Sequence, residues 1–121
     1  MTVTILTLVV LLSTHTALAD KAHVIDAHIT DLGGGRYRID ATIEHADEGW
    51  EHYANAFEVY AEDGTLLGTR ELAHPHVNEQ PFTRSLTLEL PPGTGKVEIR
   101  AVDSVHGEGG KVIVLALPAS K

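Results

Sequence analysis

The chain has 121 residues, a length that suits one domain with a single hydrophobic core. It carries 17 acidic and 9 basic side chains, a net charge of -8 with histidine neutral. This charge argues against a nucleic-acid binder, which needs clustered Lys and Arg, and against binding to an anionic membrane surface. Because the chain has no Cys and one Met, the initiator, disulfides, thiol catalysis and sulfur ligands for a metal are excluded.

The first 19 residues have the features of a secretory signal peptide. Residues 4–12 form an apolar stretch too short to span a bilayer, and Ala17-Leu18-Ala19 matches a cleavage site of the A-x-A type. We expect cleavage after residue 19, which leaves residues 20–121 as one secreted domain, most simply in a bacterial periplasm. The alternative is an uncleaved amino-terminal anchor.

After this segment the sequence alternates between apolar and polar residues, with Gly, Pro and Asp at the boundaries of each run. Alternation of period two predicts β-strands that bury one face. The predicted strands cover, in chain order, residues 25–29, 36–44, 53–59, 66–73, 82–90, 97–101 and 112–117. The first strand is marked by the alternate apolar residues Ile25, Ala27 and Ile29, which we expect on its inward face. Residues 46–52 could form one helical turn, and no longer helix is predicted.

Seven short strands with these spacings predict an all-β fold, a seven-stranded sandwich like an immunoglobulin or fibronectin type III domain. The Cys…Trp…Cys signature of antibody domains is absent, which favours the fibronectin-like form. A cupredoxin-like Greek-key barrel is the alternative, and the local pattern does not separate the two.

Histidines gather in three connections that a sandwich of this kind brings to one pole. The connections after the second, fourth and sixth strands emerge at the same end. These connections carry five of the eight histidines: His45, His52, His74, His76 and His106. The connections at the opposite pole, residues 33–35, 62–65 and 91–95, carry none.

This gathering predicts a metal site. Imidazoles and carboxylates on loops of a rigid scaffold can converge on one divalent first-row metal ion. With no sulfur ligand, Cu(I) and a blue-copper centre are excluded, so Cu(II) or Zn(II) remains. We predict three or four of the five histidines as ligands. His45 continues the inward face of its strand, and His74 and His76 face one side across the stiff Pro75.

Charged residues near these histidines are predicted to support the site. Glu79 and Asp103 are candidates for orienting imidazoles from a second shell of contacts. Arg84 interrupts the inward face of its strand, and we expect it to pair with Asp103 or Glu79 and so tie the loops together.

Other residues of the same pole have simpler interpretations. The neighbours Asp47 and Glu48 are expected to be a solvated loop pair rather than an acid and base. Trp50, the one Trp, is predicted to plug the core. The alternative for Trp50 is a binding surface shared with Tyr53.

Three functions are compatible with these features. The favoured one is a secreted metal-binding protein that carries Cu(II) or Zn(II), or delivers it to a protein partner. The second is a metal-free interaction module whose His-rich pole binds a protein, with its histidines tying loop carbonyls together. The third is a small metal-dependent enzyme, which the limited room for a substrate pocket disfavours.

Three stretches of the sequence resemble those of a group of small, uncharacterised secreted bacterial proteins. They read GWEHYA at residues 49–54, HPHVNEQPFTRS at residues 74–85 and DSVHG at residues 103–107. The resemblance covers nearly all of the chain after the signal segment and is compatible with a β-sandwich. It implies no catalytic residue.

Overall fold

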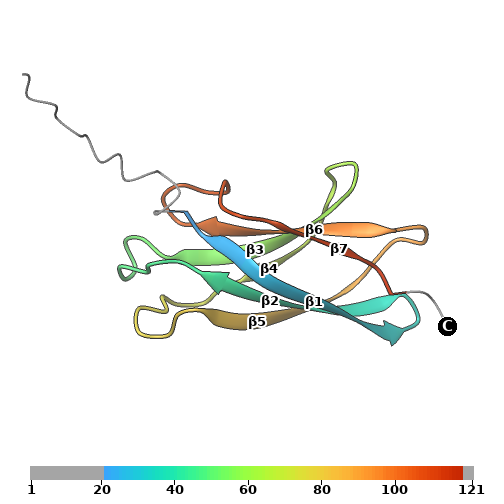
Figure 1. Cartoon of the computed structure of the whole chain (residues 1–121), viewed down its shortest axis with the longest axis horizontal. Coiled ribbons are helices and arrows are strands. Elements are labelled where there is room, and N and C mark those ends of the chain that lie inside the picture. The colour runs from blue at the N-terminus through green and yellow to red at the C-terminus, as the bar shows by residue number, and fades with distance from the viewer. Residues whose placement is uncertain (1–20, 119–121) are drawn as a thin grey trace, which may run out of the picture.

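Seven strands in two antiparallel sheets make up the protein in its computed structural model, which describes residues 21–118 (Figure 1). The strands are β1 (His23–Gly33), β2 (Arg36–Glu44), β3 (Ala54–Ala61), β4 (Leu66–Glu71), β5 (Phe82–Glu89), β6 (Lys96–Asp103) and β7 (Ile113–Ala116). The predicted signal segment, residues 1–19, lies outside the described residues. Within the described part, no helix is long and apolar enough to cross a membrane.

The strand order is that of a sandwich with two separate sheets. One sheet has the order β1-β2-β5 and the other the order β4-β3-β6-β7. In the constant-type immunoglobulin domain the fourth strand joins the sheet of the first, second and fifth strands, whereas here β4 pairs with β3. The predicted all-β sandwich is therefore confirmed in its fibronectin-like form. The two sheets do not join into one ladder within residues 21–118, so the barrel alternative does not describe the chain.

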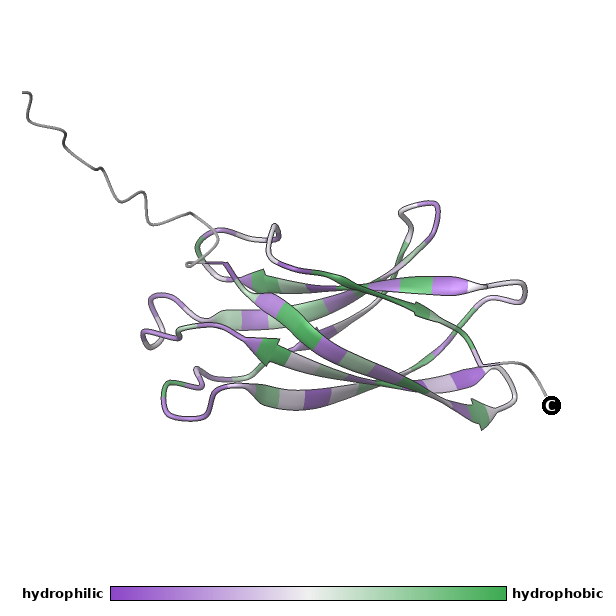
Figure 2. Cartoon of the chain, in the orientation of Figure 1, coloured by the Kyte–Doolittle hydropathy of each residue, from purple (hydrophilic) through white to green (hydrophobic). Residues whose placement is uncertain are grey.

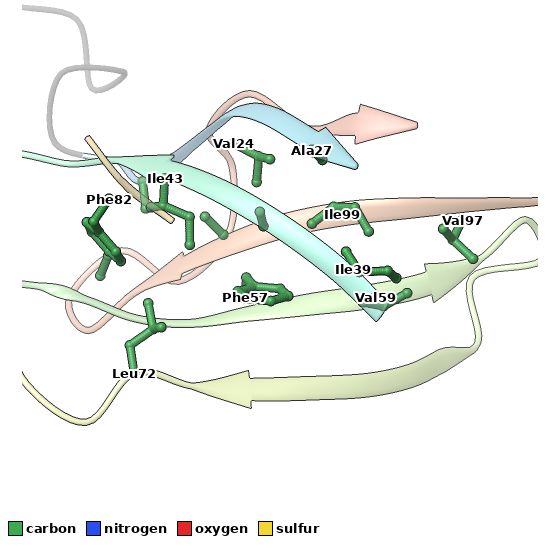
Figure 3. Close-up of a cluster of buried hydrophobic side chains, with 14 of the residues drawn as sticks. Val24, Ala27, Ile39, Ile43, Phe57, Val59, Leu72, Phe82, Val97 and Ile99 are labelled. Carbon is green, nitrogen blue, oxygen red and sulfur yellow. The ribbon is translucent and has the colours of Figure 1, made fainter. Parts of the chain in front are cut away.

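The core lies between the two sheets, where their inward faces meet (Figure 3). Alternate residues of β2, β3 and β6 are buried, as the period of two predicts. The residues with the lowest exposure on these strands are Ile39, Ala41, Ile43, Ala54, Phe57, Val59, Val97 and Ile99. The alternating bands along the strands in Figure 2 show the same periodicity.

One predicted inward residue faces outward because β1 contains a bulge. Val24 pairs with Ile43 and Asp26 pairs with Thr42, so Ile25 is an extra residue in the ladder. A bulge of this kind reverses the faces that follow it. The residues of β1 buried in the core are accordingly Val24 and Ala27, while Ile25 is 42% exposed. The prediction that Ile25 points inward was wrong.

The connections β2–β3, β4–β5 and β6–β7 lie at one end of the sandwich, beside the start of β1 (Figure 1). This is the His-rich pole that the strand order predicts. Residues 46–52 form turns and no helix, with the His52 amide donating to the Gly49 carbonyl at 3.2 Å.

Two isoleucines of the same sheet test the bulge. Ile39→Ala is expected to lower the free energy of unfolding by about 3 kcal/mol, because a fully buried side chain leaves a cavity. Ile25→Ala is expected to cost about 0.5 kcal/mol, as at an exposed position. Urea unfolding of both variants measures the difference, and equal losses would show that Ile25 belongs to the core.

Candidate metal centre

Three side chains, two from the β2–β3 connection and one from the end of β6, meet at the His-rich pole. His45 follows the last residue of β2, His52 lies in the β2–β3 connection, and Asp103 is the last residue of β6. Their side chains are 1%, 12% and 0% exposed, respectively. Each offers one ligand atom, and these atoms all lie within 4.8 Å of one another. The group is therefore an internal cluster with its outer edge at His52.

The distances within this group suit a small metal ion. Nε2 of His45 lies 3.6 Å from Oδ2 of Asp103, and Nε2 of His52 lies 3.3 Å from Oδ1 of Asp103. In a tetrahedral zinc site with bonds of about 2.0–2.1 Å, neighbouring ligand atoms lie about 3.3–3.5 Å apart. The two distances end on different oxygens of Asp103, and one ligand atom of each residue lies within 4.8 Å of the others. Two imidazoles and a carboxylate this close together could converge on one ion.

The carboxylate of Asp103 is held in place by the backbone that follows it. Oδ1 accepts hydrogen bonds from the amides of Val105 and His106, both at 2.7 Å. Burial alone would raise the pKa of Asp103, but these amides and the His52 ring outweigh it and lower the pKa, so the group is a carboxylate. Oδ2 is buried and has no hydrogen-bond partner. A buried carboxylate oxygen without a donor is the feature that a cation would satisfy.

Asp47 orients His45 from the other side. Its side chain has no exposed area, and Oδ1 lies 2.5 Å from Nδ1 of His45. Because an ionised carboxylate accepts hydrogen bonds, Nδ1 carries the proton, and in the neutral ring Nε2 presents its lone pair toward Asp103. Histidines that bind a metal through one ring nitrogen commonly donate a hydrogen bond from the other nitrogen to a carboxylate, as His45 does to Asp47.

Asp47 also joins three segments of the pole. Oδ1 accepts the amide of Ala54 at 2.9 Å, and Oδ2 accepts the amide of His76 at 2.6 Å. The expectation that Asp47 is a solvated loop residue was wrong. The signal was its spacing: His45 faces inward, and a residue two positions further along extended backbone faces the same side.

His106 lies at the edge of this group. Its side chain is exposed, and its ring centroid lies 5.1 Å from that of His52, at an interplanar angle of 74°. His52 in turn lies 4.7 Å from His45, also edge to face. The structure therefore brings together three of the five histidines predicted as ligands, with His106 outside the group that meets at Asp103.

The other two histidines form a separate pair. The His76 ring stacks on Phe82, with centroids 3.9 Å apart, and His74 lies against His76 at 4.6 Å. Nε2 of His76 lies 3.0 Å from Nη2 of Arg84. Burial, the Arg84 charge and the nearby His74 lower the pKa of His76, which keeps the ring neutral. A guanidinium beside this nitrogen repels a metal cation, so the structure does not place this pair in the same site as His45 and His52.

The charged residues predicted to support the site take different places. Nη2 of Arg84 lies 3.5 Å from Oε1 of Glu79, which is one of its two predicted partners. Among the described residues, no ion pair joins Arg84 to the other predicted partner, Asp103. Glu79 thus pairs with Arg84 near His76 and does not orient an imidazole of the central group. Asp103 faces both Nε2 atoms directly, which is a closer position than the second shell of contacts predicted for it.

Trp50 does not plug the core. It is 68% exposed and packs edge to face on Tyr53, with centroids 5.6 Å apart. Phe57 on β3 and Phe82 on β5 fill the interior below the pole, which leaves no space for a larger ring. Trp50 is therefore an exposed residue of the pole that packs on the half-buried Tyr53. The alternative, a binding surface that Trp50 shares with Tyr53, stays a prediction.

A second set of contacts fixes the β6–β7 connection beside the site. Glu108 accepts a hydrogen bond from the Tyr60 hydroxyl at 2.7 Å and pairs with Arg100 at 3.0 Å. Arg100 also pairs with Glu98 at 2.6 Å and lies over the Tyr60 ring, 4.0 Å from its centroid. These contacts tie the connection that carries His106 to the outer face of the sheet.

Comparisons with known proteins give one relative by sequence and one by structure. No family model matches the chain. A protein of Halomicrobium mukohataei described as "Putative lipoprotein" is 40% identical over 95 residues, which make up 78% of this chain and 47% of that protein. The chain thus spans about half the length of this relative. The superoxide reductase (1Fe-SOR) of Giardia intestinalis is similar in structure, with a TM-score of 0.46 and 14% identity over 78% of this chain and 99% of that one.

Removal of Asp47 tests whether it organises the pole. Asp47→Ala is expected to lower the free energy of unfolding of the metal-free chain by about 3 kcal/mol, because two buried amides and the His45 ring lose their acceptor. Its sequence neighbour Glu48, 66% exposed, is the control, and Glu48→Ala is expected to cost less than about 0.5 kcal/mol. Similar denaturation midpoints for the two variants would contradict this role.

The Tyr60 contact predicts a dependence on alkaline pH. The hydrogen bond to Glu108, with burial and the Glu58 charge, raises the pKa of Tyr60 from 10.0 to about 12. Because the folded chain holds this proton more tightly than the unfolded chain, the contribution to stability is complete below pH 10.0 and is lost as the pH rises toward 12. Absorbance titration should show a tyrosine step near pH 12 that Tyr60→Phe removes. A late step that persists in Tyr60→Phe would assign it to another tyrosine.

Proposed function

We propose that this protein binds one divalent first-row metal ion, Zn(II) or Cu(II), through His45, His52 and Asp103. The observation that supports it most directly is the buried Oδ2 of Asp103, which has no hydrogen-bond partner and faces Nε2 of His45 at 3.6 Å. Two imidazoles and a carboxylate are a donor set that suits both ions.

The charges of the pole support a cation in this position. Asp47 and Asp103 both have fully buried side chains, and two buried carboxylates without a counter-charge would be strongly unfavourable. A divalent ion on Nε2 of His45 would neutralise both, directly at Asp103 and through the imidazole at Asp47. The ion supplies the positive charge, and the histidines that bind it are neutral. Because acid protonates these histidines, binding weakens as the pH falls.

The second candidate function needs no metal. The His45 ring lies between the two carboxylates, with Nδ1 2.5 Å from Oδ1 of Asp47 and Nε2 3.6 Å from Oδ2 of Asp103. With a proton on both nitrogens, this ring would itself supply the positive charge. The pole would then be a rigid, metal-free face for binding a protein. The two functions differ in whether a divalent ion binds tightly, which titration measures.

In the favoured function the role is carriage or delivery of the ion. Three protein ligands leave the remaining coordination position for water or for a group of a receiving protein. The segment predicted as a signal and the lipoprotein description of the Halomicrobium relative both support export to the cell envelope. We propose that the protein works there, with a protein partner as the source or receiver of the metal.

Calorimetric titration of the untagged chain with Zn(II) and Cu(II) at neutral pH tests the proposal. We expect one ion per chain, and His52→Ala is expected to weaken binding about 100-fold because a direct ligand is lost. Asp47→Asn is expected to weaken binding about 10-fold, because His45 loses its orienting carboxylate.

His74→Ala is the matched control, since His74 is a histidine of the same pole whose ring lies against His76. It should leave the affinity unchanged. Binding no tighter than that of scattered surface histidines, or equal losses in His52→Ala and His74→Ala, would refute the metal site and favour the metal-free function.

A further inference from the structure

Three imidazoles form a row from the interior of the pole to solvent. The His45 side chain is 1% exposed, the His52 side chain is 12% exposed, and His106 is exposed. Ring centroids are 4.7 Å apart in the first step and 5.1 Å in the second, and both steps are edge to face. An ion that reaches His45 and Asp103 along this row would meet an imidazole at each step.

The row is fixed at its outer end by the ligand carboxylate itself. The amide of His106 donates to Oδ1 of Asp103, the same oxygen that Nε2 of His52 approaches. Asp103 and Gly107 also exchange two backbone hydrogen bonds, at 3.0 and 2.9 Å, which close the turn that carries His106. These bonds hold the His106 backbone beside the site, while its side chain is exposed to solvent.

We infer that His106 is a transfer ligand, through which the ion enters and leaves the site. This inference rests on the proposed metal site and adds to it a route. A hydrated divalent ion cannot lose all its water at once, because an ion without ligands is strongly unfavourable in a protein interior. At His106 the ion would exchange one water for an imidazole nitrogen, then bind His52, and then move to His45 and Asp103. His106 would be released as the inner ligands bind.

The other exposed histidine of the pole lacks the features of such a route. His74 lies against His76, and it is Nε2 of His76 that lies 3.0 Å from the Arg84 guanidinium. A positive charge at that position opposes the approach of a cation. His74 is therefore a suitable control, because it is a histidine of the same pole as His106 but does not belong to the row.

A transfer ligand and a resident ligand differ in kinetics. A residue that only lowers the barrier changes the association and dissociation rates by the same factor, and leaves the equilibrium unchanged. A resident ligand stabilises the bound state, so its loss raises the dissociation constant. Rates and affinity measured on one variant therefore separate the two roles.

The experiment is stopped-flow mixing of the untagged full chain with Cu(II), followed by the fluorescence of Trp50, the one Trp in the sequence. Release is followed after mixing the loaded chain with excess EDTA. We expect His106→Ala to slow both association and release about 10-fold and to keep the dissociation constant within about twofold. His74→Ala should change none of the three, and denaturation midpoints verify that both variants are folded.

Two results would overturn the inference while leaving the metal site intact. Unchanged rates in His106→Ala would exclude a role in transfer. A weaker affinity with unchanged association would make His106 a resident ligand. Failure of the unmodified chain to bind Cu(II) or Zn(II) in calorimetry would instead overturn the proposed function, and the transfer role with it.

Discussion

The His-rich pole depends on one buried carboxylate. Asp47 accepts three hydrogen bonds, from the ring of His45, the amide of Ala54 at the start of β3 and the amide of His76 in the β4–β5 connection. Each bond comes from a different segment, so the group determines where three parts of the chain meet. In the low-dielectric interior these bonds are strong, and the cost of leaving such a group without partners is high. The position of His45, and with it the candidate metal centre, follows from this constraint.

The pole holds a second buried carboxylate, that of Asp103. Asp103 ends β6 directly opposite the start of β3, and its Oδ1 closes the turn to His106. Two buried negative charges need a positive partner, which a metal ion or a protonated His45 can provide. Both possibilities use the same residues. In both, His52 and His106 lie between the buried His45 and the solvent.

Much of the fold was predictable because it depends on local alternation. Ile39, Ala41 and Ile43 alternate with polar residues, and burial of that face requires a sheet with a partner. Ile25 was misassigned because a bulge inserts one residue and reverses the faces, and no local pattern marks it. Trp50 was misassigned because its burial depends on whether Phe57 and Phe82 already fill the space below the pole.

The sequence by itself determined the all-β class, the placement of the connections at two poles and the gathering of histidines at one of them. These follow from strand periodicity and strand order, which are properties of the chain. Only the tertiary structure decided which histidines meet, since His45 and His52 converge on Asp103 while His76 packs against His74 and contacts Arg84. Side-chain convergence across loops depends on distances of a few ångströms between segments remote in sequence. Spacing along the chain does not contain those distances.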